Sequence, residues 1–244
     1  MRRIFLCCLA LLVVDVPMAW AGGQMMPGGG GPMTGRPGMN QGMGGAPDEE
    51  ISSAPVAEKP DAAAKKAYAA GMKALAKAKE YEQEAAKASN ADKKSRAMEK
   101  VGNEFSKALD QFTEALRNKG DMVEAWDNVG YVHMRLGAYR EAVDDYNHTL
   151  ALKPDLLEAI EHRGEAYLAV DRLEDAKGAY MDLFYHARPL ADQLMTAMQA
   201  WQDQHRVAAN GMSAADIDSF GKWLQERGAA DKATASATAP NPRP

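Results

Sequence analysis

The feature that most constrains the fold of this chain is an internal repeat with a period of 34 residues. Sliding the sequence along itself by this interval superposes acidic, small and aromatic residues on residues of the same kind. The superposed pairs are Glu124 and Glu158, Ala125 and Ala159, Gly130 and Gly164, Ala142 and Ala176, and Tyr146 and Tyr180. A weaker upstream copy sets Phe105, Ala108 and Phe112 on Tyr139, Ala142 and Tyr146. A repeat of this length predicts stacked units that bury apolar surface against their neighbours.

The chain between its two terminal segments has a helical pattern throughout. Proline is absent from 61 to 153, and no stretch shows the sustained alternation of polar and β-branched residues that marks a strand. Apolar residues recur instead at intervals of three and four. Besides the repeats, helices are expected over 61–88, 190–207 and 213–227. The folded part is therefore predicted to be all-α.

Some helix boundaries can also be proposed from the sequence. Ser213 and Asp216 form a variant capping box that starts the last helix, and Gly228 is expected to end it. The pattern over 91–118 permits either one long helix or two helices separated by a turn at Gly102-Asn103.

The repeated units resemble the tetratricopeptide repeat. Unit 123–156 matches its pattern through Trp126, Val129, Gly130, Ala142, Tyr146 and Pro154. Unit 157–190 matches through Gly164, Tyr167, Ala176 and Tyr180, and departs from it at Ile160, Arg163 and Arg188. The resemblance implies a tetratricopeptide-type α-solenoid of helix–turn–helix repeats with flanking capping helices and disordered N- and C-terminal segments. The N-terminal helices over 61–122 include a partial repeat (89–122), the caps lie over 191–228, and the tail is 229–244.

The repeated residues have physical roles in this prediction. Gly130 and Gly164 allow two helices to approach closely, because a side chain there would force them apart. Tyr146 and Tyr180 fill the gaps between helices with large apolar area. Pro154 ends a helix because its ring cannot continue the hydrogen-bond ladder.

The resemblance also implies a binding surface, because first helices of successive tetratricopeptide repeats line a concave groove. The residues at the groove positions are Glu124, Asp127, Asn128, Tyr131, Met134, Arg135, Glu158, Glu161, His162, Glu165 and Leu168. Some family members hold a ligand's terminal carboxylate with Lys, Asn and Arg, but this wall is mainly acidic. We therefore expect a protein or peptide partner with a basic and apolar segment. The alternatives are a solvated acidic face, and a structural subunit that holds its neighbours through the convex face and tails.

The N-terminus has the layout of a secretory signal peptide over 1–21. A positive start precedes an apolar run, Ile4 to Val14, which is too short to span a membrane, and the predicted cleavage site follows Ala21. Cleavage removes Cys7 and Cys8, so the mature chain needs no disulfide framework. We expect export, to the periplasm of a Gram-negative bacterium.

The segment after the signal peptide, 22–60, is rich in glycine, proline and methionine and is expected to be a disordered tether. Its methionine thioethers suggest an alternative function, capture of copper(I). The candidate ligands are Met25, Met26, Met33, Met39 and Met43. Against a metal site, Met-x-x-Met spacing is absent and no histidine lies near them.

The rest of the composition argues against catalysis. No two histidines have the H-x-H or H-x-x-x-H spacing of a metal site, and no nucleotide-binding or hydrolase motif occurs. The formal charge of -5 gives no general attraction for nucleic acid. The sequence therefore predicts a non-enzymatic protein-binding adaptor or assembly factor without a cofactor, and leaves its oligomeric state open.

Overall fold

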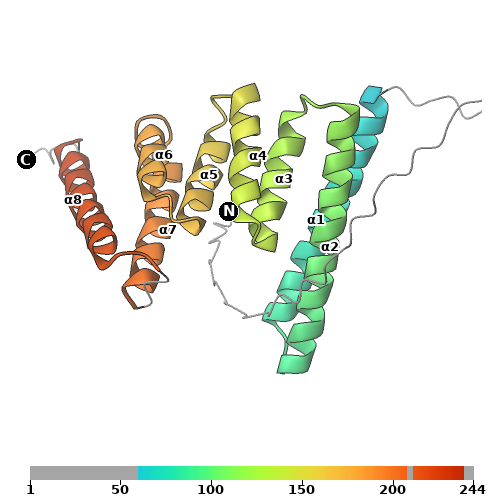
Figure 1. The fold of residues 1–244 in the computed structure, drawn as a ribbon, viewed down its shortest axis with the longest axis horizontal. Coiled ribbons are helices and arrows are strands. Elements are labelled where there is room, and N and C mark those ends of the chain that lie inside the picture. Colours follow the sequence, from blue (N-terminus) through green and yellow to red (C-terminus); the bar gives the residue numbers. More distant parts are fainter. Residues whose placement is uncertain (1–59, 208–210, 239–244) are drawn as a thin grey trace, which may run out of the picture. The chain divides into compact units, whose positions relative to one another are not determined.

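The computed structural model describes residues 60–207 and 211–238, which form eight helices and no strand (Figure 1). The helices are α1 (Pro60–Ala86), α2 (Ala91–Asn118), α3 (Val123–Leu136), α4 (Tyr139–Leu152), α5 (Leu157–Ala169), α6 (Leu173–His186), α7 (Arg188–Val207) and α8 (Ala214–Thr238). Each helix packs against the next one along the chain. The predicted signal peptide, its cleavage site and the tether methionines lie outside the described residues.

The helices α3 to α6 form two helix–turn–helix units whose bounds follow the 34-residue period of the sequence. Gly137 closes α3 in the left-handed conformation, with φ of 78°, and Asp171 takes the same conformation after α5, with φ of 59°. The helix α4 ends at Leu152, directly before Lys153 and Pro154, as the proline predicts. These residues therefore have the all-α, tetratricopeptide-type architecture expected from the sequence.

The two repeat glycines lie at close helix contacts. A Cβ added at Gly130 would lie 2.9 Å from the ring of Tyr146, which confirms the expected approach of α3 to α4. A Cβ at Gly164 would lie 2.6 Å from Leu194 of α7 and 3.3 Å from Ala179 of α6. The nearest neighbour of Gly164 therefore belongs to the following helix pair rather than to its own repeat.

The segment 91–118, for which the sequence permits one helix or two, is the single helix α2. It begins at the cap residue Asn90, whose side chain accepts a hydrogen bond of 2.9 Å from the Lys93 N–H. The partial repeat predicted over 89–122 therefore contains only one helix. Its partner is α1, which precedes that range and packs along α2. A Cβ at Gly71 of α1 would lie 2.6 Å from Phe112, the same glycine–ring contact as in the next unit.

The helices α7 and α8 follow the repeats. Trp201 is buried and Trp223 is partly buried against the core. Ser213 caps α8 by accepting a 3.1 Å hydrogen bond from the Asp216 N–H. The prediction that Gly228 ends this helix is wrong, because α8 continues to Thr238. The residues after Gly228 are rich in alanine, whose high helix propensity offsets the cost of one interior glycine.

The buried apolar side chains form two large clusters. One joins α1, α2 and α3, and the other joins α4 through α8. The boundary between these clusters falls inside a repeat, between α3 and the helices α4 and α5.

Candidate functional site

The predicted groove residues come from α3 and α5, which lie one repeat apart and contact each other. Their exposure differs widely. The exposed ones are Glu124, Arg135 and Glu158. The partly buried ones are Asp127, Asn128, Tyr131, Met134, His162 and Glu165. We call these nine residues the α3/α5 face.

Two predicted groove residues do not belong to this surface. Leu168 is only 4% exposed and packs in the α4–α8 core, so it offers no apolar anchor to a partner. Glu161 is only 5% exposed. Both lie on α5, which is covered on another side by α7, and a position in the repeat pattern does not reveal that covering. The apolar part of the face is reduced to Tyr131 and Met134.

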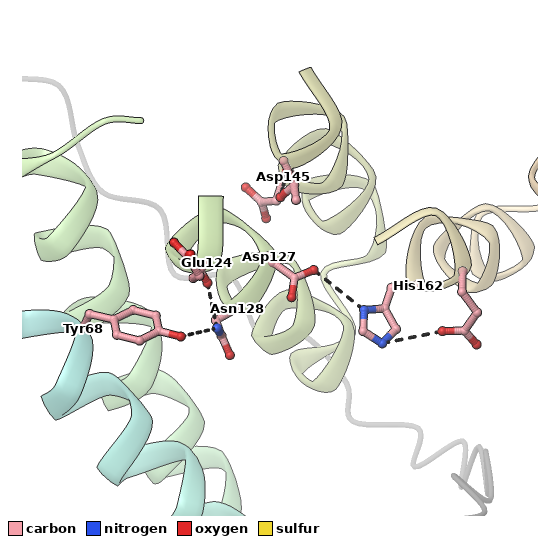
Figure 2. Close-up of polar contacts among 8 residues, drawn as sticks. Tyr68, Glu124, Asp127, Asn128, Asp145 and His162 are labelled. Atoms are coloured by element: carbon pink, nitrogen blue, oxygen red, sulfur yellow. Dashed lines mark hydrogen bonds and ion pairs between the residues drawn. The ribbon is translucent and has the colours of Figure 1, made fainter. Parts of the chain in front are cut away.

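The sequence pattern did not predict that side chains of α1 contact residues of this face. The Asn128 amide donates a 3.2 Å hydrogen bond to the Tyr68 hydroxyl and a 2.7 Å bond to the Glu124 carbonyl (Figure 2). Arg135 pairs with Glu82 of α1. Asn128 and Arg135, the residues that match the carboxylate-holding mode of the family, are therefore both engaged by α1.

A further α1 side chain reaches the face at Tyr131. The Lys79 ammonium lies 5.3 Å from the centre of the Tyr131 ring, within the range of a cation–π contact. The sequence signal that points to α1 is Gly71 in an alanine-rich helix, followed by the aromatic Phe112, although their spacing differs from that of the later repeats.

A cluster of titratable side chains lies where α5 meets α3. His162 lies 3.8 Å from Asp127 through Nδ1 and 3.6 Å from Glu161 through Nε2 (Figure 2). Both distances exceed that of a hydrogen bond, and the His162 Nδ1 and Asp127 Oδ1 atoms are buried without a hydrogen-bond partner. These groups interact mainly through charge.

Burial and mutual charge shift the proton affinities in this cluster. The pKa of Glu161 is raised to about 7, mainly by burial and in smaller part by the neighbouring Glu165 carboxyl. Burial also raises the pKa of Glu165. Burial by itself lowers the pKa of His162, but Asp127 and the two glutamates outweigh it and leave that pKa raised. The cluster therefore holds protons more tightly than the free side chains do.

Other histidines are paired or stacked with neighbouring side chains. His133 of α3 contacts the Asp145 carboxylate of α4 at 2.5 Å. His148 stacks on Trp126 with ring centres 4.5 Å apart, and His205 stacks on Trp201 at 3.9 Å. Among the described side chains, no group of three or more His, Cys, Asp or Glu is arranged to hold a metal ion.

A membrane-spanning segment is not found in this part of the chain either. None of the helices α1 to α8 combines the length and the apolar character that crossing a bilayer requires.

Among the comparisons with known proteins, only the one with solved structures finds similar chains. No family model matches the chain, and no curated protein matches it. The Arabidopsis OM64 TPR domain is 16% identical, over 59% of this chain and 98% of that one, with a TM-score of 0.44. The first TPR of Spaghetti (RPAP3), bound to the HSP90 peptide SRMEEVD, is 20% identical over 55% and 94%, with a TM-score of 0.38. The TPR2B domain of yeast Sti1, in complex with pHsp70, is 16% identical over 65% and 98%, with a TM-score of 0.33.

Proposed function

We propose that this chain is a non-enzymatic adaptor or assembly factor that binds another protein through the α3/α5 face. The observation that carries the proposal is the chemistry of this face. It combines the exposed carboxylates of Glu124 and Glu158 with the partly exposed side chains of Tyr131 and Met134. Carboxylates around a small apolar patch complement a segment that carries lysine or arginine next to an apolar side chain.

The surroundings of the face favour an internal basic segment over a partner's terminal carboxylate. Asn128 and Arg135 are already held by Tyr68 and Glu82 of α1. A carboxylate ligand would have to displace Glu82 and approach Glu124 and Asp127. A cationic side chain would instead pair with the exposed carboxylates of Glu124 and Glu158, and the like charge that it meets is the Lys79 ammonium beside Tyr131.

Site-specific photo-crosslinking in cells tests this proposal. A photoreactive amino acid placed at Tyr131 is expected to capture a protein that the same group at Asp144 does not capture, because Asp144 is exposed on α4, outside the face. Mass spectrometry of the adduct identifies the partner and its crosslinked segment. Equal capture at both positions, or a crosslinked segment without basic residues, contradicts the proposal.

We also propose that the adaptor acts after export, in the periplasm of a Gram-negative bacterium. The support is the signal-peptide layout that ends at Ala21. Fractionation and intact-mass measurement of the expressed protein test this directly. We expect a mature chain that begins at Gly22 in the periplasmic fraction. An uncleaved chain in the cytoplasmic fraction contradicts the proposal.

A further inference from the structure

Three of the five histidines lie where α3 meets α4 and α5, at the boundary between the two apolar clusters. His133 pairs with Asp145 across α3 and α4. His148 of α4 stacks on Trp126 of α3. His162 of α5 faces Asp127 of α3, and its ring lies 5.7 Å from that of Tyr146 of α4. Imidazoles change charge near neutral pH, so this boundary is titratable where the cores on both sides are mainly apolar.

We propose that this boundary, which we call the joint, is proton-sensitive: it is held most tightly when His133 and His162 are charged and loosens as they lose their protons. The geometry carries the proposal. Each imidazole lies on one helix and a carboxylate partner on another, so the attraction that ties the two helices together is strongest while the imidazole is positive. A neutral His133 ring can still donate its Nδ1–H to Asp145, but the attraction between opposite charges is lost. The proposal concerns the fold and does not depend on a binding partner.

The charges that face each imidazole act in one direction. Asp145 and Glu141 of α4 face His133. Asp127 of α3 faces His162, together with Glu161 and Glu165 of α5 itself. All of these groups favour the protonated imidazole.

Other helices also pack against α3 and α5 near the joint. The helices α6 and α7 meet α5 at Gly164 through the apolar side chains of Ala179 and Leu194. The helix α1 reaches α3 through Tyr68, Lys79 and Glu82. Glu82 is paired with Arg135, and the Lys79 ammonium lies over the Tyr131 ring.

The direction of the pH effect follows from comparing the folded and unfolded states. The hydrogen bond to Asp145 raises the pKa of His133, and the pKa of His162 is raised by Asp127 and the glutamates. Stability from a raised histidine pKa is complete below the unfolded value of about 6.5 and is lost as pH rises through the folded pKa. Glu161, raised from 4.5 to about 7 mainly by burial, acts in the same direction, since its buried charged form destabilises the fold. We therefore expect stability to decline between about pH 5 and pH 8.

Urea unfolding of the full chain across this pH range tests the proposal. The unfolding equilibrium constant of the unmodified chain is expected to rise at least about tenfold from pH 5 to pH 8. The double variant His133→Gln, His162→Gln is expected to lose the part of this dependence that comes from the two imidazoles, while Glu161 keeps its own part. The matched control is His186→Gln, which removes an exposed histidine of α6 outside the joint and is expected to follow the unmodified chain.

A flat stability profile of the unmodified chain overturns the proposal, and so does a loss of pH dependence in His186→Gln as large as that in the double variant. If the double variant fails to fold, a proton NMR titration of the unmodified chain decides. Two of its five histidines are then expected to titrate above the ordinary value for histidine. If all five titrate at or below that value, the proposal fails.

Discussion

The hairpin of α1 and α2 and the repeat of α3 and α4 make the same central contact with helices of very different length. A glycine of the first helix lies against a ring of the second in both: Gly71 against Phe112, and Gly130 against Tyr146. The hairpin helices have 27 and 28 residues, whereas α3 and α4 have 14 each. The two helix pairs therefore share the glycine–ring contact, although their helices differ about twofold in length.

The two regions also differ in what joins them to their neighbours. The α1–α3 cluster consists of apolar side chains, and α1 and α2 contain no histidine. The junction of α3 with α4 and α5 instead combines the Gly130 contact with the pairs His133–Asp145 and His162–Asp127. Stability in the hairpin should follow mainly packing, whereas stability at the junction should follow both packing and pH.

The largest expected effect comes from removing the ring in each region. Phe112→Ala and Tyr146→Ala each empty a fully buried site and should reduce the free energy of unfolding by about 3–5 kcal/mol. Urea unfolding followed by circular dichroism reports on all helices. Fluorescence of Trp126, Trp201 and Trp223 reports on α3, α7 and α8. We expect both signals to shift together in both variants, since α3 packs on the hairpin. If Phe112→Ala leaves the fluorescence transition unchanged, the hairpin is an independent unit and the comparison fails.

A smaller effect is expected from adding one methyl group at each glycine contact. Gly71→Ala and Gly130→Ala should each destabilise the fold by about 1–3 kcal/mol, because the new Cβ meets a ring at under 3.0 Å. Matched controls inside helices are Gly102 in α2 of the hairpin and Gly178 in α6 of the next repeat, where an added Cβ meets nothing within 4 Å. Those controls should stabilise by about 0.5–1 kcal/mol through helix propensity. Destabilisation of equal size at all four glycines would contradict the account of close contact.

The smallest effect is expected at the ion pair that links the two regions. A double-mutant cycle with Glu82→Gln and Arg135→Gln should give a coupling energy of about 0.2–1 kcal/mol, because both side chains remain partly exposed to water. The coupling should fall when salt is added. A coupling well above this range would mean that α1 is held to α3 by charge more than by packing.

Much of the fold could be predicted from the sequence because the repeat residues act locally. Three predictions that follow from residue spacing are confirmed: the helix pair over 123–156, the Gly130 contact and the helix end before Pro154. The place of α1 could not be predicted in this way, because its helix is too long for Gly71 to fall on the 34-residue period.

The candidate site was predictable only in part. Position in the repeat identifies which residues of α3 and α5 fall on the same side, as with Glu124 and Glu158. It does not reveal that α7 packs on α5, that Leu168 is buried in the α4–α8 core, or that α1 contacts Asn128 and Arg135. These depend on helices outside the two well-matched repeats. Export and the identity of the partner stay predictions.

A quantitative pull-down from the cell envelope fraction tests the central claim most directly. The bait pair is the double variant Glu124→Lys, Glu158→Lys and a control with the same charge change outside the face and the joint, Asp203→Lys of α7 with Asp218→Lys of α8. All four side chains are exposed, so neither bait is expected to lose its fold. We predict that at least one protein retained by the unmodified chain and by the control is lost from the α3/α5 variant. Identical sets of retained proteins for all three baits would contradict the account.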